Sequence, residues 1–424
     1  MNNEQQHIYQ LTDHLFRQES GKMVAVLAKI FGTENLQVAE DVVQDTLLHA
    51  MEIWKYKGLP DNPPAWLYRV AKNKAIDIIR RNKFSVQYDF SDQERVLLQS
   101  EYTLATVMNN LWKEDMINDD LLRMMFACCH PDISEESQIT LILKTLCGFS
   151  TAEIAKSFLT SEETISKRLY RTKEFFRERK IRPEFPATSQ LKNRVNAVLK
   201  TIYLIFNEGY NSTHSDSLIR KDLLDQAIYL CDLLCRNAHT QLPEAYAAMA
   251  LMCFHAARIE SRISSEGEII LLSHQDRSKW DMELINTGSE YMSRATWGDE
   301  VSTYHIEAAI AYQHCIAKRF EDTNWEQILS CYNWLAIINP SAVVLLNRLM
   351  VIYQLYGAER TKEEIGKANT KPEWEKHYLY YSLLGEIYSG TDKEQSKVNY
   401  DKAMSLTQSA AEKKLLAKKI AALG

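Results

Sequence analysis

The chain has 424 residues, of which 46% are apolar and 25% charged, and its formal net charge is −6. This composition is typical of a soluble globular protein and excludes a disordered or fibrous chain. Two or three domains are expected at this length, because one hydrophobic core rarely extends beyond about 250–300 residues.

No stretch is long and apolar enough to cross a membrane, which takes about 20 residues, and residues 1–16 lack the layout of a secretory signal. We therefore expect a cytoplasmic protein without membrane contact. The eight cysteines lie mostly among apolar residues at helical spacing and form no pair of CxxC motifs. They are expected to be buried, reduced thiols.

Neither a cofactor nor an enzyme activity is expected. The neighbouring Cys128 and Cys129, followed by His130, cannot easily share one tetrahedral ion, so "CCH" predicts a helix end rather than a metal site. The sequence has no phosphate-binding loop, no nucleophile elbow and no paired metal-binding histidines.

Almost every segment predicts helix, because apolar residues recur at spacings of three and four while glycine and proline are scarce. The basic residues are concentrated in two islands. Residues 67–84 carry six bases against one acid, and residues 164–182 carry eight against two. Residues 85–120, between them, carry eight acids against two bases. Concentrated positive charge favours nucleic-acid binding despite the negative total.

Residues 150–174, "STAEIAKSFLTSEETISKRLYRTKE", predict two short helices joined by a tight turn. Ser150 with Glu153 and Thr160 with Glu163 form two expected capping boxes, about ten residues apart. The turn has Leu159 where such turns usually have glycine. Each helix has an apolar inner stripe, made of Ile154, Ala155 and Phe158 in the first and Ile165, Leu169 and Phe176 in the second. The pattern predicts a helix-turn-helix; the competing interpretation is a helical hairpin with a solvated basic face.

Two upstream segments predict amphipathic helices. One begins at Pro63 and Pro64, which suit a first helical turn, and carries the basic residues of the first island on its outer face. The other spans residues 39–54, "AEDVVQDTLLHAMEIW", with an acidic outer face that includes Leu48. An acidic face with an exposed leucine fits a protein partner better than DNA.

The order of "AEDVVQDT", "PPAWLYRVAKNKAIDIIRR", an acidic connector and "STAEIA…ETISKRLYRTKE" resembles bacterial RNA polymerase sigma factors of the extracytoplasmic-function type. The resemblance implies a promoter-specificity subunit whose partners are core RNA polymerase, through the β′ clamp helices and the β flap, and promoter DNA. It covers roughly the first 185 residues.

The resemblance carries functional roles onto matching positions of this chain. Core polymerase contact is implied for Asp41, Gln44, Asp45 and Leu48. Binding of the promoter's minus-ten element is implied for Lys55, Tyr56, Asn62, Trp66, Arg69, Lys72, Asn73, Arg80 and Arg81. Binding of the minus-thirty-five element is implied for Glu162, Glu163, Ser166, Lys167, Arg168 and Arg171.

The predicted organisation is a region 2 bundle at residues 1–86, an acidic linker at 87–118, a region 4 helix-turn-helix at 119–185 and a helical domain at 186–424. In the last of these, "YSLLGEIY" places Gly385 at a tetratricopeptide-repeat offset, with Tyr400 and Ala403 after it. The expected fold is therefore all-α, ending in an α-solenoid-like domain. The whole arrangement resembles the subgroup of these sigma factors that carries a C-terminal repeat domain, which implies that this domain regulates the sigma domains through a regulatory protein or ligand.

Two points stay open. The polar segment 272–281, "LSHQDRSKWD", predicts either a ligand or partner contact or, preferably, a loop held by an Asp/Arg pair. The competing function is a helix-turn-helix regulator that binds operators directly, as a dimer, and senses a ligand or peptide through its repeat domain.

Overall fold

The computed structural model describes residues 3–82, 109–158, 160–211, 219–264, 268–368, 371–407 and 409–423. Throughout these ranges the regular elements are helices, and the one β contact there is an isolated bridge between Ile263 and Ile269. The predicted all-α fold is confirmed. The chain divides into an N-terminal unit (Met1–Ile205 with Arg236–Thr240) and a C-terminal unit (Phe206–Cys235 with Gln241–Gly424).

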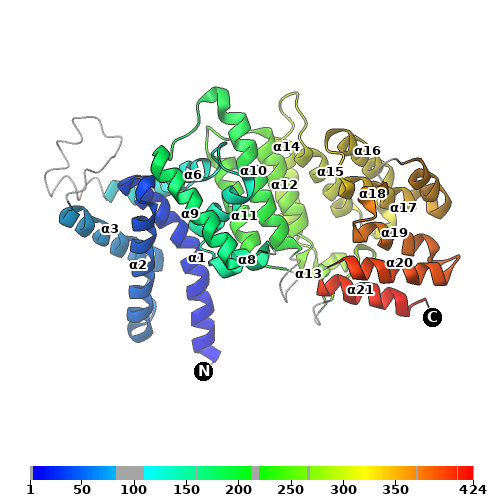
Figure 1. Cartoon of the computed structure of the whole chain (residues 1–424), viewed down its shortest axis with the longest axis horizontal. Coiled ribbons are helices and arrows are strands. Elements are labelled where there is room, and N and C mark those ends of the chain that lie inside the picture. Colours follow the sequence, from blue (N-terminus) through cyan, green and yellow to red (C-terminus); the bar gives the residue numbers. More distant parts are fainter. Residues whose placement is uncertain are drawn as a thin grey trace. The chain divides into compact units, whose positions relative to one another are not determined.

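The N-terminal unit is arranged around its first helix (Figure 1). Its elements are α1 (Asn3–Phe31), η1 (Thr33–Asn35), α2 (Leu36–Lys57), α3 (Pro63–Asn82), α6 (Glu114–Cys128), α7 (Glu135–Thr145), α8 (Thr151–Ser157), α9 (Glu162–Arg179) and most of α10 (Thr188–Tyr210). Residues 23–28 of α1 are all buried, because α2, α3, α6 and α7 all pack against that helix. A helix that is apolar all round, like this stretch, has to be covered on every side.

The predicted helix-turn-helix pair forms α8 and α9. The capping box that opens α8 is confirmed: Ser150 Oγ accepts from the backbone N–H of Glu153 at 3.2 Å, and the Glu153 carboxylate accepts from the N–H of Ser150 at 2.8 Å. The inner stripe is buried at Ile154, Ala155, Ile165, Leu169 and Phe176, and Phe158 is half-buried.

The second predicted capping box is wrong. The N-cap of α9 is Ser161, whose Oγ accepts from the backbone N–H of Thr164 at 3.1 Å. Thr160 therefore precedes the cap, and Glu163 lies at the second helical position rather than the third. Leu159, the predicted turn residue, lies outside the described residues.

The C-terminal unit consists of successive helices that pack on their neighbours. Its elements are α11 (Lys221–Arg236), α12 (Pro243–Ala256), α13 (Ile259–Arg262), η2 (Leu272–His274), η3 (Arg277–Lys279), α14 (Met282–Arg294), α15 (Thr303–Ile316), η4 (Phe320–Asp322), α16 (Trp325–Ile338), α17 (Ala342–Lys367), α18 (Lys371–Trp374), α19 (Tyr378–Ser389), α20 (Lys393–Leu406) and α21 (Ala410–Ala421). The helix α15 packs on α16, α16 on α17, α19 on α20 and α20 on α21. This nearest-neighbour packing is what an α-solenoid requires.

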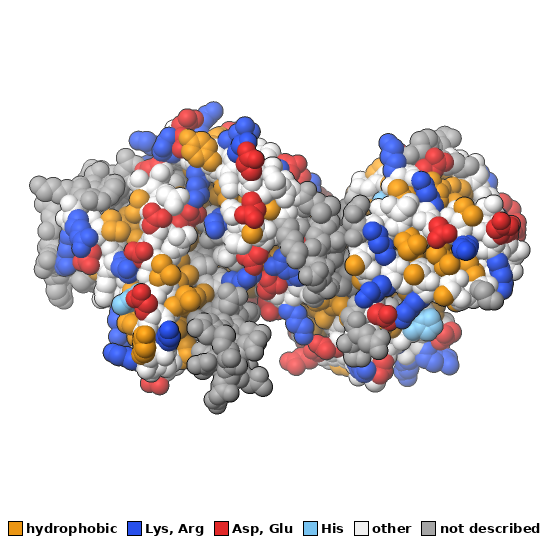
Figure 2. All heavy atoms as spheres, turned by 60° about the horizontal axis from the view of Figure 1, so that its bottom comes forward, with side chains coloured by type: hydrophobic (Ala, Val, Ile, Leu, Met, Phe, Trp, Pro, Cys, Tyr) orange, Lys and Arg blue, Asp and Glu red, His pale blue; other side chains and the backbone are white. Residues whose placement is uncertain are grey.

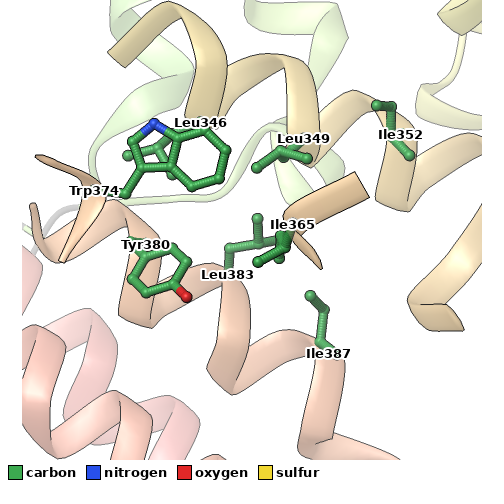
Figure 3. Close-up of a cluster of buried hydrophobic side chains, with 8 residues drawn as sticks. All are labelled: Leu346, Leu349, Ile352, Ile365, Trp374, Tyr380, Leu383 and Ile387. Atoms are coloured by element: carbon green, nitrogen blue, oxygen red, sulfur yellow. The ribbon is translucent and has the colours of Figure 1, made fainter. Parts of the chain in front are cut away.

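Apolar side chains from α17, α18 and α19 form one core cluster of this unit (Figure 3). Its buried members are Leu346, Leu349, Ile352, Ile365, Trp374, Tyr380, Leu383 and Ile387. Beside it, α19 and α20 approach closely at Gly385, where a Cβ would lie 2.4 Å from Cε1 of the buried Tyr400.

The eight cysteines are all buried and free, as predicted. Burial raises the pKa of the Cys129 and Cys147 thiols to about 12, so they are inert at neutral pH. The described residues contain no group of His, Cys, Asp or Glu side chains that could hold a metal ion. Among the helices of the described ranges, none combines the length and apolar character that crossing a membrane requires.

The predicted Asp/Arg pair in segment 272–281 is wrong. Arg277 Nη1 instead donates to the backbone carbonyls of His314 and Ala317, at 2.6 and 2.7 Å, where α15 ends. The two aspartates accept from backbone N–H groups nearby, Asp276 from Ser278 and Asp281 from Leu284. Main-chain carbonyls at a helix C-terminus carry partial negative charge, which explains why they attract a guanidinium.

Candidate protein and nucleic-acid interfaces

The outer face of α2 presents the residues predicted to contact polymerase. Asp41, Gln44, Asp45 and Leu48 are all exposed, and Leu48 has 59% of its surface accessible. The opposite face of α2 is anchored by buried residues such as Val43 and Ala50. Figure 2 shows apolar side chains lying among charged ones on the surface of this unit. An exposed leucine between acidic groups is a surface suited to a protein partner.

A groove of about 480 Å³ begins at this face. Its lining includes Gln44, Leu48 and Met51 of α2 and, from the end of α7 to the start of α8, Lys144, Thr145, Gly148, Ser150 and Glu153. The predicted polymerase face and the start of α8 therefore border the same groove within the N-terminal unit.

The outer face of α3 carries most of the predicted minus-ten residues. Arg69, Asn73, Arg80 and Arg81 are exposed. Lys72 is half-buried, and its Nζ donates to Asn109 Oδ1 at 2.6 Å. The exposed basic residues follow one another along a single helix, an arrangement that can track a phosphate backbone.

The remaining four minus-ten residues have different environments. Tyr56 is 82% exposed, with Lys55 Nζ 5.7 Å from its ring centroid. Asn62 Oδ1 accepts from the backbone N–H of Ala65 at 3.0 Å and so caps the start of α3.

Trp66, in contrast, is half-buried between α2 and α3. Its ring stacks on His49, with centroids 5.8 Å apart, and tilts against Trp54 at 5.4 Å. Of the two predicted aromatic residues, Tyr56 is thus the one whose ring is open to a base, while Trp66 is occupied in joining the two helices.

The outer face of α9 carries the predicted minus-thirty-five residues. Glu162, Glu163, Ser166, Lys167 and Arg171 are exposed, and Arg168 is half-buried. Glu163 and Lys167 form an ion pair of 2.6 Å along the helix. Exposed pairs of this kind contribute only about 0.3–0.5 kcal/mol, so a DNA contact can replace this one at little cost.

Three contacts that sequence reasoning missed join the helix-turn-helix to α1 and α2. Arg17 Nη2 lies 2.5 Å from Glu153 Oε1, and its guanidinium lies 5.0 Å from the centroid of the Phe149 ring. Lys173 Nζ of α9 lies 2.5 Å from Glu40 Oε2 of α2. The backbones also approach closely, since a Cβ on Gly21 would lie 1.9 Å from the Leu146 carbonyl oxygen.

The carboxylate of Glu153 is held ionised by these contacts. Burial by itself would raise its pKa, but hydrogen bonds from Ser150 and the nearby Arg17 guanidinium bring the pKa below its usual value. No local sequence pattern signals the pair, because Arg17 and Glu153 are 136 positions apart.

Comparison with known proteins gives two family matches. Sigma-70 region 2 matches residues 15–85, and a family of unknown function, DUF6596, matches residues 194–296. The chain is 31% identical over 382 residues to the uncharacterized protein R00370 of Rhizobium meliloti, covering 89% of this chain and 88% of that protein. It is 32% identical over 133 residues to the ECF RNA polymerase sigma factor SigL of Mycobacterium tuberculosis, covering 31% of this chain and 68% of that protein. No solved structure gives a significant match.

The region 2 match spans the whole of α2 and α3, the two helices whose outer faces carry the acidic and the basic surface. The DUF6596 match begins within α10 and ends just after α14. Sigma factors are non-enzymatic proteins that act in transcription initiation. The chain belongs to the extracytoplasmic-function family of sigma-70 RNA polymerase sigma factors, and it carries a helical C-terminal extension.

Proposed function

We propose that the protein binds core RNA polymerase through the outer face of α2 and gives the enzyme its promoter choice. The observation that carries the proposal is the exposure of Leu48 beside Asp41, Gln44 and Asp45 on a helix whose other face is buried in the unit. A rigid helix with an apolar centre and an acidic surround suits a basic helical partner such as the β′ clamp helices. The β flap is proposed as the partner of the region 4 helices.

In the promoter complex, the exposed basic face of α3 holds the separated strand of the minus-ten element. Arg69, Arg80 and Arg81 neutralise phosphates, and the exposed ring of Tyr56 offers a stacking surface for an unpaired base. A charged groove combined with an aromatic platform is the usual means of holding single-stranded DNA. Asn62 acts by fixing the start of α3, and Trp66 by fixing its angle to α2.

The outer face of α9 binds the minus-thirty-five element. Its N-terminal turn presents Glu162, Glu163 and Ser166, and its next turns present Lys167, Arg168 and Arg171. In a helix-turn-helix the N-terminal residues of the second helix meet base edges, while flanking bases contact phosphates.

The free protein is expected to bind promoters poorly. Its net charge is −6, and its positive charge is limited to two small surfaces. Because affinity for DNA grows with the number of phosphates neutralised, the polymerase has to supply the remaining contacts. The C-terminal unit is proposed to regulate this activity.

The test is gel filtration of the full chain with bacterial core RNA polymerase. The wild type is expected to co-migrate, and the double variant Asp45→Arg with Leu48→Arg is expected to lose at least about tenfold in affinity, as removal of a central interface residue does. The control is Asp401→Arg with Val398→Arg on α20, which changes an exposed acid and an exposed apolar residue at the same three-residue spacing.

Co-migration of the wild type and the α20 variant, with loss in the α2 variant, supports the proposal. If no form binds core polymerase while the free protein shifts DNA as a dimer, the proposal fails and the chain is an operator-binding regulator.

A further inference from the structure

The C-terminal unit contains a cluster of cationic and imidazole side chains that the proposed function does not use. Arg258 and Arg262 lie at the two ends of α13, Arg277 lies in η3, and His255 and His314 lie in the last turns of α12 and α15. Within the described residues, none of the three arginines forms an ion pair with a carboxylate. Two exposed acids, Glu321 and Asp322, interact electrostatically with Arg277, and Asp322 already pairs with Arg319 at 2.9 Å.

One aromatic ring of the cluster belongs to the buried Trp280. The Arg277 guanidinium lies 4.4 Å from its ring centroid and that of Arg258 lies 5.6 Å from it. The ring is fixed in place, because Trp280 Nε1 donates to Ser261 Oγ at 2.8 Å. Two guanidinium groups therefore face one immobile indole.

The other aromatic ring of the cluster belongs to Tyr210. The guanidinium of Arg262 lies 3.7 Å from its ring centroid and donates to the Tyr210 carbonyl at 2.6 Å. Arg258 Nη2 makes a long hydrogen bond of 3.3 Å to the Tyr210 hydroxyl, and the His255 ring lies 4.8 Å from the Tyr210 ring. Arg258 is thus the central member, in contact with both aromatic residues.

Four nitrogen atoms of the cluster are buried without a hydrogen-bond partner in the described structure: Arg258 Nε, Arg277 Nη2, His255 Nδ1 and His314 Nδ1. A buried donor left unpaired costs about 1–3 kcal/mol, and more when the group is charged. Arg258 Nε and Arg277 Nη2 can only donate, so these two atoms indicate that an acceptor is missing.

The charge of the cluster defines the missing partner. Burial, together with the nearby Arg258 and Arg277, lowers the pKa of His314 to about 3, and burial with Arg258 and Arg262 lowers the pKa of His255 well below its usual value. Both imidazoles are therefore neutral at pH 7 and the positive charge belongs to the three arginines. Half-buried cations without a counter-charge are costly, whereas an anion would form charge-assisted hydrogen bonds to them.

We propose that this cluster is a binding site for an oxyanion, the carboxylate or phosphate group of a small molecule, which accepts hydrogen bonds from Arg258 Nε and Arg277 Nη2. Arg262 supplies further positive charge, and the rings of Trp280 and Tyr210 hold the guanidinium groups in position. The site is independent of the sigma role and would give the C-terminal unit a small anionic ligand.

The test measures anion binding by the full chain, using thermal unfolding and calorimetry. Sodium phosphate and sodium acetate are each compared with sodium chloride at equal ionic strength. Phosphate or acetate is expected to raise the unfolding temperature above that in chloride. Binding of phosphate alone would indicate a phosphoryl ligand, and binding of acetate alone a carboxylate ligand.

The key variant is Arg258→Gln, which removes the central guanidinium. It should weaken anion binding by about tenfold, the size expected for loss of one charged hydrogen bond. Arg319→Gln removes the same charge from an exposed arginine of the same unit and should bind as the wild type does. Arg258→Lys keeps the charge but lacks the Nε–H, so it should also bind more weakly, and it serves if the glutamine variant does not fold.

The proposal is overturned if neither anion has an effect beyond that of chloride on the wild type. It is also overturned if a folded Arg258 variant binds the anion as tightly as Arg319→Gln does.

Discussion

Arg17 of α1 and Glu153 of α8 are joined by an ion pair of 2.5 Å between Nη2 and Oε1. The same carboxylate accepts from the backbone N–H of Ser150 and so completes the cap of α8. One glutamate therefore both opens the first helix of the helix-turn-helix and ties that helix to the first helix of the chain.

The two roles of Glu153 can be separated by substitution. Glu153→Gln keeps an oxygen for the cap but removes the charge, and it should cost about 1 kcal/mol or less, since the pair is partly exposed. Glu153→Ala removes both and should cost about 1–2 kcal/mol in total. Urea unfolding followed by circular dichroism gives the two values. Equal losses in the two variants would mean that the cap contributes nothing.

Asp120 of α6 predicts a pH dependence of stability in the N-terminal unit. Burial raises the pKa of Asp120 to about 6, and the ion pair with Lys29 at 2.6 Å offsets only part of this. Between about pH 4 and pH 6 the folded chain holds a proton that the unfolded chain releases, so this group's contribution to stability falls as pH rises through that window. The full effect is about 3 kcal/mol.

The measurement is the difference in unfolding free energy between wild type and Asp120→Asn from pH 4.5 to pH 7.5. As the pH falls, the wild type should become more stable relative to Asp120→Asn. Glu52→Gln, which removes an exposed carboxylate of α2 that forms no ion pair within the described residues, is the control and should not show this trend. A difference that stays constant across the range for Asp120→Asn would contradict the assignment.

Two helical glycines predict opposite effects of the same substitution. A Cβ on Gly385 would meet the buried Tyr400 ring at 2.4 Å, so Gly385→Ala should destabilise the C-terminal unit by about 1–3 kcal/mol. At Gly366, no atom lies within 4 Å of the position that an alanine methyl group would occupy, so Gly366→Ala should stabilise α17 by about 0.5–1 kcal/mol. Thermal unfolding of both variants checks the signs. A neutral Gly385→Ala would mean that α19 and α20 can separate slightly.

Local features were predictable from the sequence. The start of α3 at Pro63, the capping box at Ser150 and the buried stripes of α8 and α9 depend on residues within one or two helical turns of each other. The N-cap of α9 was misassigned because Thr160 and Ser161 are adjacent and both can cap a helix.

Contacts between distant segments were not predictable in this way. The pairs Arg17–Glu153 and Lys173–Glu40, and the arginine cluster around Trp280, join residues far apart in the chain. Contacts between distant segments also decide where the first unit ends, near the domain boundary predicted at residue 186. The N-terminal unit runs to Ile205, because α10 packs back on α6: Arg194 donates to the Phe126 carbonyl and Thr201 contacts Cys129. The exact boundaries remain a prediction.

The exposed Arg81 near the end of α3 predicts a measurable salt effect in the promoter complex. If Arg81 neutralises one phosphate, Arg81→Ala should reduce the slope of log affinity against log salt by about one in the polymerase-bound state, and it should do so equally on different promoters. Lys397→Ala removes the same charge from the exposed surface of α20 and should leave the slope unchanged. Promoter binding by the reconstituted holoenzyme across a salt series gives both slopes. If both variants reduced the slope equally, the effect would come from the net charge rather than from a phosphate contact by α3.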